Sequence, residues 1–67
     1  MRCKKGDVLV AQERFFSPAE GYLAFNPGMS VLVSYVQEPD VWLYGELQDG
    51  SKVEGWFPAL LMLKTGS

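Results

Sequence analysis

The alternation of hydrophobic and polar positions along this 67-residue chain predicts several short strands and no long helix. The run at 30–36 is rich in β-branched residues and is the strongest predicted strand. A shorter run of the same kind at 7–11 predicts a first strand. The closing segment 59–64 is too short for a stable helix. Because it follows a proline directly, we expect one tight turn and a final strand there.

A β-hairpin is predicted in the second half of the chain, with arms at 41–47 and 52–58 and a four-residue turn between them. The turn contains Asp49 and Gly50, a dipeptide that readily adopts the positive φ angles of hairpin loops. The second arm ends at Pro58, which has no amide hydrogen to donate to a sheet. Each arm carries one of the two tryptophans, and two large rings on so short a ribbon indicate a binding surface.

The segment 12–29, here called the long loop, has no sustained strand or helix period although it contains several bulky apolar residues. A structureless loop of this length is uncommon in a compact domain. We therefore expect an irregular hairpin folded over the core, with Leu23 and Phe25 pointing inward at a spacing of two. The predicted core residues are Leu9, Ala11, Leu23, Phe25, Val31, Val33, Phe57 and Met62.

Five short strands separated by turns predict an all-β fold, either a small barrel or a sandwich. A barrel has the advantage that it leaves few open sheet edges. We expect one domain at 7–64, a flexible basic lead-in at 1–6 and a tail at 65–67. A chain this short buries a small core, so its free energy of unfolding should be about 3–5 kcal/mol.

The composition argues against catalysis and against a metal centre. The chain has one cysteine, Cys3, and no histidine, so neither an internal disulfide nor the usual zinc site can form. The usual acid–base, nucleophile and phosphate-binding motifs are absent as well, and we expect no enzyme activity and no cofactor. With no apolar run of membrane-spanning length, the protein is expected to be a cytoplasmic monomer that does not insert into membranes.

The charge is distributed unevenly. The first five residues hold three of the six bases, and from Asp7 onward eight acids face three bases, a net charge of −5. An acidic body argues against nucleic-acid and anionic-membrane partners and is compatible with a basic ligand. Solubility alone is an alternative explanation for the excess of acids.

Four fragments of the sequence follow one another at a characteristic spacing. They are Ala11, Leu23-Ala24-Phe25-Asn26-Pro27-Gly28, Trp42-Leu43-Tyr44-Gly45-Glu46-Leu47, and Gly55-Trp56-Phe57-Pro58-Ala59-Leu60-Leu61-Met62. Together they resemble an SH3 domain, and the resemblance covers 7–64. It implies a five-stranded SH3-like barrel with a long RT-type loop and one 3-10 turn before the last strand. It also implies a groove for proline-rich peptides in the polyproline II form.

The resemblance is incomplete in the groove. The opening motif of the family contains a tyrosine, an acidic residue and a second tyrosine in succession. In this sequence the three positions are taken by Glu13, Arg14 and Phe15. Leu60 and Leu61 replace an asparagine and a tyrosine of the closing motif. One proline slot would therefore be lined by Glu13 and Leu61. Each lost hydrogen bond should cost about 1 kcal/mol, so an ordinary PxxP ligand should bind weakly or not at all.

The resemblance implies that the other proline slot is retained, with Phe15, Trp42 and Pro58 as walls. Trp42 and Trp56 should stand side by side across the hairpin with carboxylates nearby, an arrangement that suits arginine or lysine. Tyr22 stands where the family often has an acid. The predicted peptide-binding residues are Phe15, Glu20, Glu38, Asp40, Trp42, Trp56, Pro58 and Leu61.

We therefore predict a protein-interaction module of a larger signalling or scaffold protein, whose partner is a basic or proline-rich peptide segment. An alternative is docking onto a neighbouring domain of its own chain, because Leu60 and Leu61 place apolar side chains where the groove is normally polar. A third class, nucleic-acid binding by an SH3-like barrel, is disfavoured by the acidic body.

Overall fold

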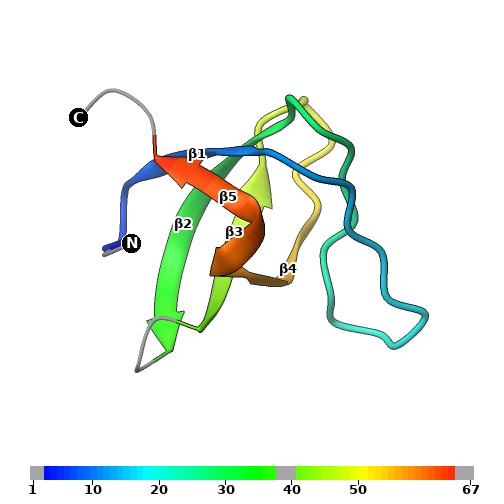
Figure 1. Ribbon diagram of the computed structural model, residues 1–67. Helices are drawn as coiled ribbons and strands as arrows, with labels where there is room; N and C mark the ends of the chain where they lie inside the picture. Colours follow the sequence, from blue (N-terminus) through cyan, green and yellow to red (C-terminus); the bar gives the residue numbers. More distant parts are fainter. Residues whose placement is uncertain (1–2, 38–40, 65–67) are drawn as a thin grey trace.

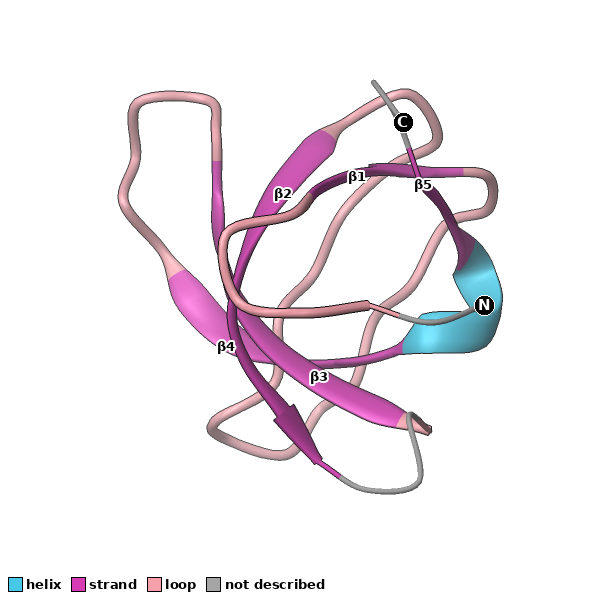
Figure 2. Ribbon diagram, turned by 90° about the vertical axis from the view of Figure 1, so that its left-hand side faces the viewer, coloured by secondary structure: helices cyan, strands magenta, loops and turns pink. Residues whose placement is uncertain are grey.

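Five antiparallel strands form a single sheet in the computed structural model, which describes residues 3–37 and 41–64. The strands are β1 (Val8–Ala11), β2 (Ser30–Gln37), β3 (Trp42–Leu47), β4 (Glu54–Pro58) and β5 (Met62–Lys64), with a 3-10 turn, η1 (Ala59–Leu61), between the last two. Their order in the sheet is β4-β3-β2-β1-β5. The sheet wraps around a common interior, and the long loop runs out from β1 and returns to β2 (Figure 1, Figure 2). The predicted all-β barrel with a turn before its last strand is confirmed.

The hairpin between β3 and β4 differs from the prediction at its turn. β4 begins only at Glu54, so the connection is longer than the four residues expected. Positive φ angles occur at Gly50 (91°) and Lys52 (60°). The Asp49 carboxylate accepts hydrogen bonds from the Ser51 amide (2.9 Å) and hydroxyl (2.6 Å). These bonds hold the pKa of Asp49 below its ordinary value and build a local turn that needs the extra residues.

The interior contains all eight predicted core residues, together with Leu43, Leu47 and Ala59. Strand β3 alternates strictly, so Leu43, Gly45 and Leu47 face inward. A Cβ atom on Gly45 would lie 2.5 Å from the carbonyl oxygen of Leu32, and the absence of a side chain lets β2 and β3 pack closely there. Leu43 and Leu47 were missing from the predicted core because the segment 41–47 was interpreted as part of a binding surface.

Strand β2 contains a β-bulge at Ser34, which the sequence pattern did not predict. Cα partners on β3 pair with Val33 and then with Tyr35, so Ser34 is the extra residue. Before the bulge the odd-numbered residues face inward, and Val33 is buried. After it the alternation is reversed: Tyr35 and Gln37 are exposed, and Val36 packs against the core. The bulge therefore turns two polar-tipped side chains of β2 to the outside.

The long loop is an irregular hairpin fastened to the sheet, as predicted. Phe15 and Phe25 exchange backbone hydrogen bonds, both 3.0 Å long. Farther along, the Leu23 amide donates to the Trp56 carbonyl and the Trp56 amide donates to the Gly21 carbonyl, each at 2.9 Å. Leu23 and Phe25 are buried. The loop is thus tied to β4 as well as to itself.

The segment before β1 is also attached to the barrel. The Gly6 amide donates to the Val33 carbonyl at 2.8 Å, and Cys3 packs against the core. The predicted boundary between lead-in and domain at residue 7 stays a prediction. None of the helices in the described residues is long and apolar enough to cross a bilayer.

Asp7 should make stability depend on acid pH. Its pKa lies below the ordinary value of 3.8, chiefly because the Lys4 amide donates to the carboxylate at 3.0 Å; the Lys64 ammonium, 3.4 Å away, adds to the effect. A carboxylate whose pKa is lower in the folded state contributes stability above its unfolded pKa of about 4. This contribution is lost as the pH falls through the folded-state pKa.

We therefore expect the urea midpoint to fall more steeply between about pH 5 and pH 2 in the wild type than in Asp7→Asn. Glu20→Gln controls for the loss of one negative charge on the surface. Parallel midpoint profiles for the wild type and Asp7→Asn would contradict this assignment.

Candidate functional site

The outer face of β2, β3 and β4 carries a group of touching aromatic rings. Trp56 lies opposite Tyr44 in the sheet, with ring centroids 5.2 Å apart at 74°. Tyr35, which the bulge turns outward, meets Trp56 from another direction at 5.9 Å and 88°. Edge-to-face pairs of this kind are favourable beyond their buried area. The Trp56 ring is therefore held in place by two tyrosines.

The two tryptophans are diagonal neighbours rather than directly opposite, because Trp42 pairs with Pro58 and Trp56 pairs with Tyr44. Tyr22 of the long loop contacts Trp42, with centroids 5.6 Å apart at 71°, and forms an isolated bridge to Trp56. A cavity of about 230 Å³ lies between Tyr22, Gln37, Trp42 and Trp56. We call it the aromatic pocket. It is smaller than a typical small-molecule site and fits one side-chain head group.

Gly55 explains how the long loop reaches this position. A Cβ atom there would lie 2.5 Å from the Leu23 nitrogen and 2.6 Å from the Tyr22 carbonyl carbon. Only glycine lets the loop backbone lie directly on β4 and present the Tyr22 ring beside Trp42. Gly55 is therefore required by the backbone, and the close approach of the long loop is the cause.

The three predicted walls of the retained proline slot lie together. Phe15 meets Trp42 with ring centroids 6.4 Å apart at 64°, and Pro58 is the cross-strand partner of Trp42. All three side chains are partly exposed. Trp42 therefore contributes both to this slot and to the aromatic pocket, so the two adjoin one another.

The remaining predicted residues have different surroundings. Leu61 is half-buried, and its backbone carbonyl accepts a hydrogen bond from the Gln12 backbone N–H at 2.8 Å. Glu20 is exposed on the long loop and is not among the residues that line the aromatic pocket. Glu38 and Asp40 lie outside the described residues. Their roles, and that of Leu61, stay predictions.

The described residues that line the aromatic pocket carry few polar side-chain atoms. Of its lining residues in the described chain, none is charged; Tyr22 contributes a hydroxyl and Gln37 an amide. Sequence reasoning did not place either among the binding residues. The position of Tyr22 within the long loop was a usable signal, whereas Gln37 could be found only by locating the bulge. No cluster of three or more His, Cys, Asp or Glu side chains suited to a metal occurs within 3–37 and 41–64.

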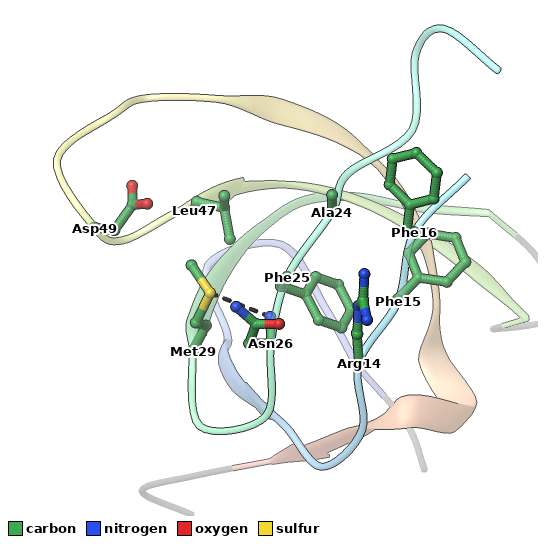
Figure 3. A pocket seen from close by; sticks show the side chains of 9 residues that line it. All are labelled: Arg14, Phe15, Phe16, Ala24, Phe25, Asn26, Met29, Leu47 and Asp49. Carbon is green, nitrogen blue, oxygen red and sulfur yellow. Dashed lines mark hydrogen bonds between the residues drawn. The ribbon is translucent and has the colours of Figure 1, made fainter. Parts of the chain in front are cut away.

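A second cavity of about 300 Å³ lies beside the Phe15 end of the site, between the long loop and the β3–β4 connection (Figure 3). Phe15 and Phe16 form part of its wall. The backbone N–H of Asn26 donates a hydrogen bond to the Met29 sulfur, with an N–S distance of 3.2 Å. The two charged residues of the cavity, Arg14 and Asp49, are well separated, with Asn26 and Met29 between them in the view of Figure 3. This cavity was not predicted from the sequence.

The chain is similar to solved structures of SH3 domains. The SH3 domain of yeast NBP2 matches with a TM-score of 0.79 and 26% identity, over 91% of this chain and 100% of that one. The C-terminal SH3 domain of myosin IB from Entamoeba histolytica, bound to an EhFP10(GEF) peptide, matches with a TM-score of 0.77 and 22% identity, over 92% and 97%. A second structure of the same myosin IB domain matches with a TM-score of 0.72, 19% identity and the same coverage. No family model and no curated protein matches the sequence.

Proposed function

Because this chain is an SH3 domain, we propose that it is a protein-interaction module that binds a basic, proline-containing peptide segment at the hairpin end of its groove. The observation that carries the proposal is the position of Trp42. Its ring contacts both Phe15 and Tyr22, so it borders a proline-sized slot as well as the aromatic pocket. We further propose that residues 7–64 act as a module of a larger cytoplasmic signalling or scaffold protein.

The physics of the slot suits an extended peptide. A polyproline II segment is already extended, so it loses little conformational entropy when it docks on aromatic rings. In the proposed complex a proline ring packs between Phe15, Trp42 and Pro58, and the next basic side chain enters the aromatic pocket. The similar myosin IB domain is seen with a bound peptide, which supports a peptide partner for this chain.

The far end of the groove should contribute less. Glu13 is exposed, and Leu61 has an aliphatic side chain without a hydrogen-bond donor. Peptide carbonyls that pass this end would find fewer donors than at a tyrosine-lined slot. Affinity is therefore expected to come mainly from Phe15, Trp42 and Trp56, with Glu20, Glu38, Asp40 and Leu61 as lesser contributors.

The test is a titration with basic, proline-containing peptides, followed by backbone-amide chemical shifts. Shifts should centre on Phe15, Trp42 and Trp56, and Trp42→Ala should raise the Kd at least tenfold, since truncating a central aromatic anchor costs about 2 kcal/mol. Leu60→Ala is the matched control, because Leu60 lies outside the proposed contacts. Shifts confined to other surfaces, or an unchanged Kd in Trp42→Ala, would refute the proposed site.

One observation favours a second candidate function, docking onto a neighbouring domain of the same chain. Leu60 is 89% exposed on η1, an unusual degree for leucine. If that docking dominates, the isolated domain should ignore the peptides yet bind its flanking domain in trans. Leu60→Ala would then weaken the association, and Trp42→Ala would affect it less. The two variants thus separate the two candidates.

A further inference from the structure

Three rings and one amide line the aromatic pocket. Tyr22 and Trp42 stand at 71° to one another and form a corner, and Trp56 contributes a third ring. The Trp56 ring packs against Tyr44 and Tyr35, which are not among the residues that line the pocket. The faces of aromatic rings carry the π electrons and attract cations.

The lining residues that the structure describes offer few partners for N–H groups. A lysine ammonium has three N–H donors and an arginine guanidinium has five. Among the described lining residues, only the Tyr22 hydroxyl and the Gln37 amide carry a side-chain acceptor, because an indole nitrogen only donates. An ordinary ammonium or guanidinium that gives up water molecules on these rings would lose hydrogen bonds that the described lining residues do not replace.

These observations point to a cation without N–H groups. We propose that the aromatic pocket binds the trimethylammonium head of a trimethylated lysine in a protein partner. The proposal rests on the proposed function, because it names the side chain that the hairpin end of the groove recognises. A trimethylammonium group leaves no donor unsatisfied, and its positive charge is attracted by the rings and by the net charge of −5 from Asp7 onward.

A peptide is a better source of this group than a membrane. Lysine carries its head on a flexible four-carbon stem, so the peptide backbone can follow the slot beside Phe15 while the head enters the pocket. Choline lipids carry the same chemical group. However, from Asp7 onward the chain is strongly acidic, and anionic bilayers attract proteins through clusters of basic residues.

The first experiment uses N-acetyl amides of trimethyllysine, lysine and arginine, together with the uncharged tert-butyl analogue of trimethyllysine. The probes are titrated while the indole N–H shifts of Trp42 and Trp56 are followed. Trimethyllysine should half-saturate at a concentration at least about fivefold lower than any of the others. Equal or tighter binding of lysine, arginine or the uncharged analogue would overturn the proposal.

Variants of Tyr22 test the wall itself. Tyr22→Phe keeps the ring and should keep the preference, whereas Tyr22→Leu should weaken trimethyllysine binding at least fivefold. Tyr22→Glu introduces a carboxylate that pairs with N–H donors, so it should reverse the preference toward arginine. Phe16→Leu is the matched control on the same loop, because Phe16 is 66% exposed and does not line the pocket. An unchanged preference in Tyr22→Leu would overturn the proposal.

The failures of the inference and of the proposed function are distinguishable. If unmodified basic peptides bind through Trp42 and trimethylation adds nothing, the inference is wrong and the proposed function stands. If neither modified nor unmodified peptides bind, the proposed function is wrong. Co-sedimentation with phosphatidylcholine vesicles, without binding of the trimethyllysine probe, would assign the pocket to a lipid head group and overturn the inference.

Discussion

Gly55→Ala should destabilise the domain and remove one wall of its pocket in a single step. The new Cβ would lie 2.5 Å from the Leu23 nitrogen and 2.6 Å from the Tyr22 carbonyl carbon, and both are backbone atoms that cannot rotate away. Overpacking of this kind costs about 1–3 kcal/mol. If the loop moves instead, the two hydrogen bonds between Trp56 and the long loop are lost, at about 1 kcal/mol each.

The prediction is measured by urea unfolding and by peptide titration of the same variant. We expect the free energy of unfolding to fall by about 2–4 kcal/mol and peptide affinity to fall with it. Gly21→Ala is the control. Its φ is +87° and nothing lies within 4 Å of its Cβ position, so it adds backbone strain of about 1 kcal/mol without a clash. Equal effects of the two substitutions would show that the close approach at Gly55 carries no special cost.

Phe57→Ala should leave the domain largely unfolded at 25 °C. Phe57 is completely buried and is the largest such side chain, and its ring meets Phe25 at 6.0 Å and 81°. Truncating a buried phenylalanine costs about 3–5 kcal/mol. A domain of this size has about that much stability in total.

Amide chemical-shift dispersion and a thermal scan would show the loss directly. Phe16→Ala is the matched control, since the 66% exposed ring of Phe16 should be removable with a change within about 0.5 kcal/mol. A cooperative transition in Phe57→Ala near the wild-type midpoint would mean that the core refills the space around Phe25 and Gly45.

The fold was predictable because its signals are local and agree with one another. The β-branched run of β2 and the proline before η1 each indicate the element that is observed. The inward positions of Leu23 and Phe25 followed from a spacing of two. The turn between β3 and β4 was predicted too short, because its length depends on the hydrogen bonds that Asp49 makes with Ser51.

The site was predictable only in part. Phe15, Trp42 and Pro58 could be assigned together from their motif positions, and the structure brings them together. Neither Tyr22 nor Gln37 was assigned to the pocket, although the position of Tyr22 in the long loop was a usable signal. The place of Tyr22 depends on a backbone contact at Gly55, and that of Gln37 depends on an irregularity in β2. Neither the close contact at Gly55 nor the bulge in β2 changes the hydrophobic periodicity in a way that the sequence reveals.

The bulge at Ser34 has a consequence for how such domains diverge. One extra residue decides that Tyr35 and Gln37 face outward while Val36 faces the core. An insertion or deletion here would exchange the two faces of the remaining strand, even if every other amino acid were retained. The side chains that line the aromatic pocket can therefore change through a single insertion or deletion in β2. A position-by-position comparison that ignores the gap would pair a pocket-lining residue with a core residue.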